Sequence, residues 1–214
     1  MKITYLGHAC FQITASNGTT IITDPYTRVG YELPLGLSAD LVTVSHGHFD
    51  HNYLDGVKTS QVITEQGEYL FNGIKIVAKN SFHDEKQGAL RGKNLLFCFE
   101  VDGIRICHLG DLGEACRADI LEKIGEVDLL LIPVGGTYTI DAVQAKEYVE
   151  KCQPCVAIPM HFRPQDGTLD IAPISQFLDL FDAENVKNIP DGEFEFQKVD
   201  LLSLPAVVHV GIRR

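Results

Sequence analysis

Residues 45–51 read Ser-His-Gly-His-Phe-Asp-His and place four potential metal ligands within six positions, at the end of an apolar, strand-like run. The four ligands are His46, His48, Asp50 and His51. Imidazole and carboxylate groups suit zinc, iron or manganese. Successive side chains of a regular strand point to opposite faces, so the ligands can converge only where the chain leaves strand geometry. We expect Gly47 to provide the tight loop that allows this.

Three further candidate ligands each lie just past an apolar, strand-like run. They are His83, Asp111 and His161. Rigid scaffolds commonly present site residues on loops at one end of a sheet, so we expect these side chains to converge on the loop 46–51. His108 and His209 lie inside strand-like runs and are expected to be packed residues and not ligands.

The pattern of apolar residues predicts a strand-rich chain with helices in its second half. The runs expected as strands are 3–6, 10–14, 19–23, 41–45, 61–64, 74–79, 95–101, 104–109, 129–133, 156–160, 194–199 and 206–212, and those expected as helices are 117–124, 142–151 and 173–181. The pairs 17–18 (Asn-Gly) and 102–103 (Asp-Gly) are hairpin signals, and Asp141 with Gln144 predicts a capping box. This order favours an α/β protein in which two face-to-face sheets are flanked by helices, in one domain over residues 1–214.

Composition excludes some classes of partner. The chain is 45% hydrophobic and 22% charged, which is ordinary for a packed globular protein. Its net charge is −11 and Arg213–Arg214 is its one basic pair, so we expect no long nucleic acid partner. The start of the sequence lacks an apolar signal segment and no run reaches membrane-spanning length, from which we expect a cytoplasmic protein without a membrane partner. The sequence carries no signal for an oligomeric state.

The six cysteines are expected to be free thiols, because a cytoplasmic chain of this length has no need of a disulfide framework. Cys152 and Cys155 have the spacing of a redox motif. They lack a thioredoxin-like surrounding pattern, and two cysteines alone cannot form a four-ligand zinc site. Ordinary thiols are therefore favoured over a redox role.

The order of these motifs resembles the metallo-β-lactamase superfamily. The resemblance rests on the pattern HxHxDH, followed by a lone histidine, an aspartate after glycine and a second lone histidine. The segments 7–11 (GHACF) and 23–25 (TDP) further resemble the branch that contains ascorbate-6-phosphate lactonase. The motifs extend from Gly7 to His161. The resemblance implies the αββα sandwich of the metallo-β-lactamase fold and a metal-dependent hydrolase.

The same resemblance implies a site for two divalent metal ions. One ion is bound by His46, His48 and His83, the other by Asp50, His51 and His161, and Asp111 bridges them. We expect zinc, with manganese and iron as alternatives that this ligand set accepts. Two ions, two aspartates and a bridging hydroxide sum to a charge of about +1, which favours a small anionic substrate. The hydroxide would attack an ester-like bond in a lactone or a phosphorylated small molecule, with Asp50 and Asp111 as catalytic carboxylates.

Four other residues have two interpretations each. His8 could face the substrate or be a structural residue beside a turn glycine. Asp24 could orient a metal-bound imidazole as a second layer of support, or end a strand in an Asp-Pro turn. Tyr138 could donate a hydrogen bond to the substrate or belong to an ordinary glycine turn. Arg163 could contact a substrate anion, although a solvated side chain is the favoured interpretation.

Other functions are compatible with this ligand pattern. A phosphodiesterase or nuclease for small substrates is one, because two metals also promote in-line displacement. Di-iron redox proteins of similar fold carry a glutamate where His48 stands and append a flavin-binding segment, and the sequence shows neither. A metal-binding protein without catalysis would combine the same ligands with an occluded pocket.

Overall fold

The computed structural model describes residues 1–213 and contains two large sheets and a small two-stranded one. In spatial order, the six-stranded sheet contains β15 (Glu193–Glu195), β1 (Lys2–Gly7), β2 (Cys10–Thr14), β3 (Thr20–Thr23), β5 (Leu41–Thr43) and β7 (Val62–Ile63). The eight-stranded sheet contains β14 (Val186–Ile189), β16 (Val207–Val210), β13 (Val156–Met160), β12 (Leu129–Pro133), β11 (Ile104–His108), β10 (Lys93–Val101), β9 (Ile74–Phe82) and β8 (Gly67–Phe71). The small sheet pairs β4 (Leu37–Ser38) with β6 (Val57–Lys58).

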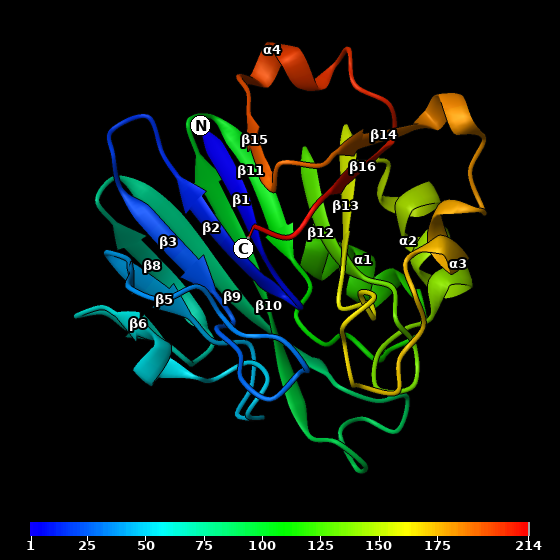
Figure 1. Cartoon of the computed structure of the whole chain (residues 1–214), viewed down its shortest axis with the longest axis horizontal. Coiled ribbons are helices and arrows are strands. Elements are labelled where there is room, and N and C mark those ends of the chain that lie inside the picture. Colours follow the sequence, from blue (N-terminus) through cyan, green and yellow to red (C-terminus); the bar gives the residue numbers. More distant parts are fainter. Residues whose placement is uncertain (214) are drawn as a thin grey trace.

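The helices are short and lie mainly on the eight-stranded sheet. They are α1 (Ala118–Ile124), α2 (Ala142–Cys152), α3 (Ser175–Leu178) and α4 (Lys198–Leu201), with the 3-10 turns η1 (Leu54–Gly56) and η2 (Ala183–Asn185). Helices α1 and α2 contact β10 and β12, and α3 packs on α2. Figure 1 shows these three helices together on one side of the molecule, beside the strands of the eight-stranded sheet.

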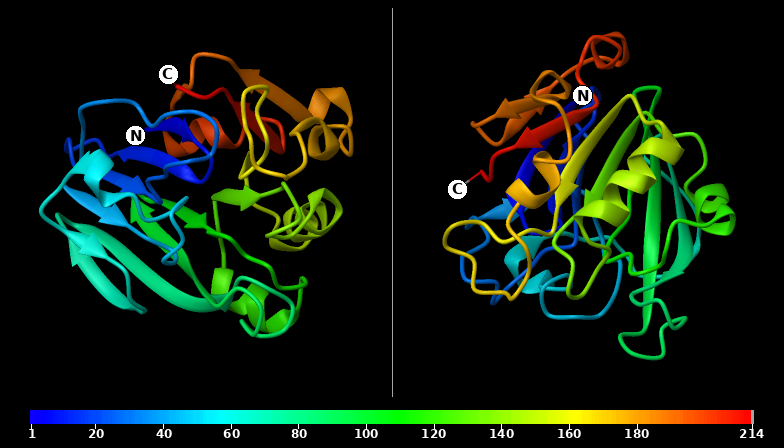
Figure 2. Two further views of the ribbon diagram at one scale, coloured as in Figure 1. Left: turned by 60° about the horizontal axis from the view of Figure 1, so that its bottom comes forward. Right: turned by 90° about the vertical axis from the view of Figure 1, so that its right-hand side faces the viewer.

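The two large sheets pack face to face around the main core (Figure 2). Tyr5 and Phe11 from the first sheet join Phe97 and Phe99 from the second in one buried cluster. Alternate residues of the first sheet, such as Leu6, belong to a second cluster on its outer face, as the two-residue period of strands requires. Loop side chains from residues 26–33 cover that outer face. The predicted α/β fold of two packed, helix-flanked sheets is confirmed.

Local signals in the sequence determine several boundaries. Asp102 and Gly103 have φ of 52° and 74°, as a two-residue hairpin between β10 and β11 requires. Helix α2 begins at the predicted capping box: the Asp141 carboxylate accepts from Gln144 N at 2.9 Å, and Gln144 Oε1 accepts from Asp141 N at 3.0 Å. Both predictions are confirmed.

Strand direction brings distant segments to one edge of the eight-stranded sheet. Strands β9 and β11 are each antiparallel to β10, so they run the same way, and β11, β12 and β13 are parallel. The carboxyl ends of these strands therefore lie at the same edge. Strand β9 continues to Phe82, three residues beyond the predicted end, so that the residue after it, His83, stands at this edge.

Some predicted elements were wrong in extent. The helix expected over 173–181 is the four-residue α3, and the strand expected over 194–199 divides into β15 and α4. A capping bond from Gln197 N to Asp200 Oδ2 starts α4 and ends the extended run. No helix within residues 1–213 is long and apolar enough to cross a membrane. The cytoplasmic location and the single domain stay predictions from the sequence.

The expectation that Gly47 is required for the ligand loop was wrong. Its φ lies outside the left-handed region and a Cβ atom there would meet nothing within 4 Å. The glycine that the site does require is Gly110, with φ of +53°. A Cβ atom at Gly110 would lie 2.7 Å from that of Ser45 and would also overlap Asn94 Oδ1. Only glycine allows the end of β11 to approach the ligand loop so closely.

We therefore expect Gly110→Ala to lower the free energy of unfolding by at least about 2 kcal/mol, through the overlap and the left-handed φ. The matched control Gly47→Ala should change it by less than about 0.5 kcal/mol, since the site is open. Urea unfolding followed by circular dichroism measures both. Equal effects at the two positions would contradict this account.

Candidate metal centre

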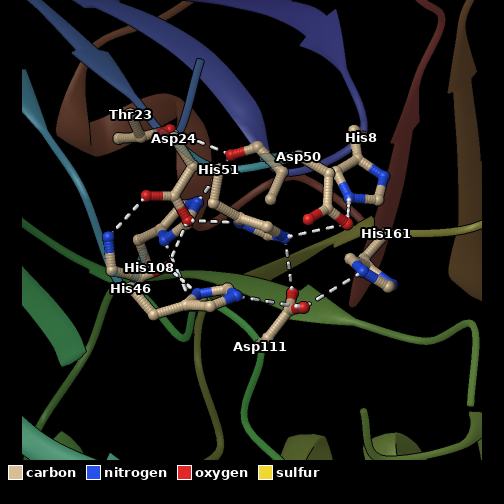
Figure 3. A network of polar contacts seen from close by, with 12 residues as sticks. His8, Thr23, Asp24, His46, Asp50, His51, His108, Asp111 and His161 are labelled. Atoms are coloured by element: carbon tan, nitrogen blue, oxygen red, sulfur yellow. Dashed lines mark hydrogen bonds and ion pairs between the residues drawn. The ribbon is translucent and has the colours of Figure 1, made fainter. Parts of the chain in front are cut away.

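All seven predicted ligands converge on one site between the two sheets. The loop after β5 supplies His46, His48, Asp50 and His51, and the residues beyond β9, β11 and β13 supply His83, Asp111 and His161. Figure 3 shows His46 and His51 from the loop after β5, and His161 from beyond β13, directed toward Asp111.

The potential ligand atoms form three overlapping groups, within each of which they lie no more than 4.8 Å apart. The groups are His46, His48 and His83; His8, Asp50, His51 and His161; and His46, His51 and Asp111. The first two groups contain the two ligand sets that the resemblance implies, with His8 as an addition to the second. The third group connects the first two.

The Asp111 carboxylate occupies the centre of the cluster. Its Oδ1 lies 3.1 Å from His51 Nε2, and its Oδ2 lies 3.1 Å from His83 Nε2 and 3.3 Å from His161 Nε2. Burial opposes ionisation of Asp111, but the neighbouring His161 and His51 outweigh it and hold the pKa of this carboxyl well below its usual value. Asp111 is therefore a buried anion that requires cationic partners.

The main chain of Asp111 is fixed by Asn94, a residue that sequence reasoning missed. Asp111 N donates to Asn94 Oδ1 at 2.9 Å, and the Asn94 amide donates to Leu109 O and Ser81 Oγ at 2.8 Å each. Asn94 is fully buried within the apolar strand β10. A buried polar residue requires partners, so an asparagine in an apolar run was a usable signal.

Unpartnered polar atoms show that the cluster fits a metal ion. Of eight buried side-chain N and O atoms without a hydrogen-bond partner in the described chain, six belong to this cluster. They lie on His46, His51, His83, Asp111 and His161. Leaving such an atom unsatisfied costs about 1–3 kcal/mol. Nitrogen and carboxylate donors converging in this way match the ligand chemistry of zinc, manganese and iron.

The protonation states of two histidines suit metal binding. Burial and the nearby His51 lower the pKa of His46 to about 3. Burial and the nearby His161 lower the pKa of His8 to about 4, against the opposing effect of Asp50. Both imidazoles are thus neutral at pH 7, the form in which a ring nitrogen can bind a metal.

Asp24 supports His51 from behind, which favours the first of its two interpretations. The fully buried Asp24 carboxylate accepts from His51 Nδ1 at 2.9 Å, from Ser45 N at 2.7 Å and from Ser45 Oγ at 2.6 Å (Figure 3). These bonds direct His51 Nε2 toward Asp111. A carboxylate in this position fixes the tautomer and orientation of an imidazole ligand.

His8 lies inside the cluster. Its Nε2 is 3.2 Å from Asp50 Oδ2, and its backbone oxygen accepts from His161 N at 2.8 Å. Both His8 and His161 have left-handed backbones, with φ of 53° and 52°. Such conformations are costly for residues other than glycine and occur most often at functional sites. His8 does not line the cavity beside the ligands, so a role in supporting the ligands is favoured over a substrate-facing one and over the turn interpretation.

Other predicted residues lie outside the ligand groups. His108 is buried and bonded to Ala9 O and Gly110 N, so it is a packed residue, as expected. His209 contacts Asn188 at the far end of the sheet order. Cys152 and Cys155 are free thiols and belong to none of the ligand groups found in residues 1–213.

A cavity of about 320 Å³ opens beside the candidate ligands. Its lining residues are His48, Phe49, Asp50, His83, Arg91, Asp111, Tyr138 and Leu169. Tyr138 is 38% exposed and forms part of the wall, so its phenol can reach a molecule in the cavity. Arg163 does not line this cavity.

Comparisons with known proteins identify the family. A family model described as a β-lactamase superfamily domain matches residues 2–161, a range that contains every candidate ligand. The chain is also 40% identical to a Thermotoga maritima protein of known crystal structure, with a TM-score of 0.79 and 97% of each chain covered. That protein is described as a candidate Zn-dependent hydrolase of the metallo-β-lactamase superfamily. The present chain belongs to the metallo-β-lactamase superfamily.

Curated relatives of this superfamily member are named UPF0173 metal-dependent hydrolases. One, from Thermococcus onnurineus, is 30% identical over 193 residues, and another, from Carboxydothermus hydrogenoformans, is 31% identical over 193 residues. Each alignment covers 76% of this chain and 84% of the relative. The superfamily member described here is accordingly a metal-dependent hydrolase, and its fold is the metallo-β-lactamase fold predicted from the sequence.

Removal of metal should destabilise the protein, because cations would satisfy the unpartnered atoms of the cluster. A metal present at 100 times its dissociation constant stabilises the folded state by about 2.7 kcal/mol. Dialysis against a chelator should lower Tm, and added zinc should restore it. In Asp111→Asn the response to chelator and zinc should be much smaller. A wild-type Tm that responds to neither treatment would contradict the assignment of this cluster as a metal site.

Asp24→Asn should weaken metal affinity about 10- to 100-fold, because the neutral amide no longer holds His51 as the carboxylate does. Competition with a chromogenic chelator measures the affinity. Asp40→Asn is the matched control, since Asp40 accepts two bonds from Thr20 at an exposed position of the same sheet. Equal affinity in the Asp24 and Asp40 variants would show that Asp24 is only structural.

Proposed function

We propose that this hydrolase uses two divalent metal ions to cleave an ester-like bond in a small anionic molecule, a lactone or a phosphorylated compound. The observation that carries the proposal is the set of three overlapping ligand groups. Asp111 faces His83 of the first group and His51 of the second, so it lies between the two candidate metal positions. We further propose, from the resemblance of segments 7–11 and 23–25, that the chain belongs to the branch that contains ascorbate-6-phosphate lactonase.

In this proposal the first ion is held by His46, His48 and His83, the second by Asp50, His51 and His161, and Asp111 lies between them. We propose zinc, supported by the description of the Thermotoga maritima relative as Zn-dependent. Manganese and iron are alternatives, because imidazole and carboxylate ligands accept each of these metals.

The bound ions would lower the pKa of water to near neutrality and stabilise the negative charge that develops on the substrate. Asp50 borders the cavity, and contact with His8 and His51 holds the pKa of this carboxyl below its usual range despite burial. An ionised Asp50 only accepts hydrogen bonds, so the neutral His8 must donate through Nε2. His8 thereby fixes Asp50, which can orient the attacking water. Tyr138, which lines the same cavity, can donate a hydrogen bond to the substrate.

The cavity favours small substrates. Its volume of about 320 Å³ is at the lower end of the usual range for ligand sites, roughly 300–1,000 Å³. A net charge of −11 disfavours long nucleic acid, whereas a small phosphodiester would fit the same ligands. The open cavity beside the ligands does not fit a metal-binding protein with an occluded pocket.

The decisive experiment combines metal content with turnover. Elemental analysis of protein purified without added metal should find about two equivalents of zinc per chain, largely lost in Asp111→Ala and His48→Ala. His209→Ala is the matched control and should retain the metal. The loaded wild type should hydrolyse at least one of δ-valerolactone, an aryl ester and bis(4-nitrophenyl) phosphate, and both ligand variants should lose at least about 100-fold in kcat/KM.

Each outcome separates one alternative. Hydrolysis of the phosphodiester alone would replace the ester assignment with a phosphodiesterase. Iron at this stoichiometry with no hydrolysis would favour redox chemistry. Absence of bound metal even after reconstitution would overturn the two-metal proposal.

A further inference from the structure

Arg91 is the one lysine or arginine that lines the 320 Å³ cavity in the described part of the chain. Its side chain is half-buried and forms no ion pair with any residue between 1 and 213. A guanidinium has five N–H donors in a planar fork suited to carboxylate and phosphate. An unpaired cation at the wall of a reaction cavity requires an explanation.

The loop that carries Arg91 is fixed by a buried carboxylate. Asp84 accepts hydrogen bonds from the backbone N–H groups of Lys86, Gly88, Leu90 and Arg91, at 2.7–3.0 Å. Asp84, the residue directly after the candidate ligand His83, thus holds the backbone of Arg91 in place.

The guanidinium itself is held by two residues of the loop after β12. Arg91 Nη2 donates to Thr137 O at 3.0 Å, and its Cζ lies 5.6 Å from the centroid of the Tyr138 ring. Thr137 has φ of 58°, a costly conformation for a β-branched residue that directs its carbonyl to this bond. One donor is used in this way, and the remaining donors are free for a ligand.

The cavity wall combines apolar and polar side chains. Phe49 and Leu169 line it together with Arg91 and the candidate ligands, and Phe49 is 49% exposed. A neighbouring cavity of about 230 Å³ shares Arg91 and Tyr138, and Asp84, Glu85 and Lys86 also line its wall. In the 320 Å³ cavity, two bound metal ions would outweigh the charges of Asp50 and Asp111, so an anion is favoured there once metal is bound.

We propose that Arg91, held by Asp84, Thr137 and Tyr138, binds an anionic group of the substrate, a carboxylate or a phosphate, that is separate from the bond that is cleaved. The substrate class is then an ester or lactone with a separate acidic group. This inference rests on the proposed hydrolytic function and assigns its specificity to a residue outside the metal cluster.

The test uses two substrates that differ by one charge: mono(4-nitrophenyl) adipate and its methyl ester. In Arg91→Gln, kcat/KM for the monoanion should fall roughly 10- to 100-fold, the usual loss for hydrogen bonds to a charged group. For the methyl ester it should change less than about 3-fold. Arg91→Lys retains the charge without the planar fork and should recover part of the loss.

Arg163→Gln is the matched control, because Arg163 is exposed and lines other cavities. It should leave both substrates unaffected, and Tm should show that all variants remain folded. Equal losses on the two esters in Arg91→Gln, or the same selective loss in Arg163→Gln, would overturn the inference while leaving the hydrolase proposal intact.

A binding measurement separates failure of this inference from failure of the proposed function. If the wild type cleaves neither ester, ester hydrolysis itself is in error, and calorimetry with adipate and inorganic phosphate decides the role of Arg91. Binding of either anion that weakens at least 10-fold in Arg91→Gln supports the anion site and identifies the preferred group. Unchanged binding of both anions refutes it.

Discussion

The buried Asp111 carboxylate is the constraint on which the rest of the structure depends. It carries a charge in a site between two sheets, where the imidazoles of His51, His83 and His161 face it. A buried charge is tolerated only with cationic compensation. The arrangement of β9, β11 and β13, whose ends deliver His83, Asp111 and His161, therefore makes structural sense as a binding site for cations.

Several residues of this site have strained backbone conformations. His8, Asp24 and His161 all have positive φ, at about 1–3 kcal/mol for each such residue. The large core between the sheets supports these conformations, and so do local hydrogen bonds: Asp24 accepts from His51 Nδ1, and His8 O accepts from His161 N. Thr137, whose carbonyl oxygen accepts a hydrogen bond from Arg91, also has a positive φ, so the proposed substrate side carries the same kind of strain.

Two functional side chains, His51 and Arg91, are thus held in place in the same way. Asp24 fixes an imidazole through a buried carboxylate, and Asp84 fixes the loop of Arg91 through another. In each case an acidic residue without direct access to the substrate determines where a functional side chain points. Asp24 orients a candidate metal ligand, and Asp84 orients the loop of the cation that we assign to substrate binding.

The sequence by itself determined the fold class, the ligand loop 46–51 and the kinds of metal ion that histidine and aspartate ligands accept. These depend on residue type, short spacing and two-residue periodicity, all of which are local. The sequence supported His83 as a ligand only weakly, because the residues around His83 match no motif. It also predicted that the ligand loop needs glycine at position 47, whereas the close approach of backbone segments requires glycine at position 110. Only the tertiary structure decided that β9 extends to Phe82, that Asn94 holds Asp111, and that Arg91 meets Tyr138 across the cavity. Those contacts join residues far apart in the chain, and their geometry follows from strand order and direction, which no local pattern encodes.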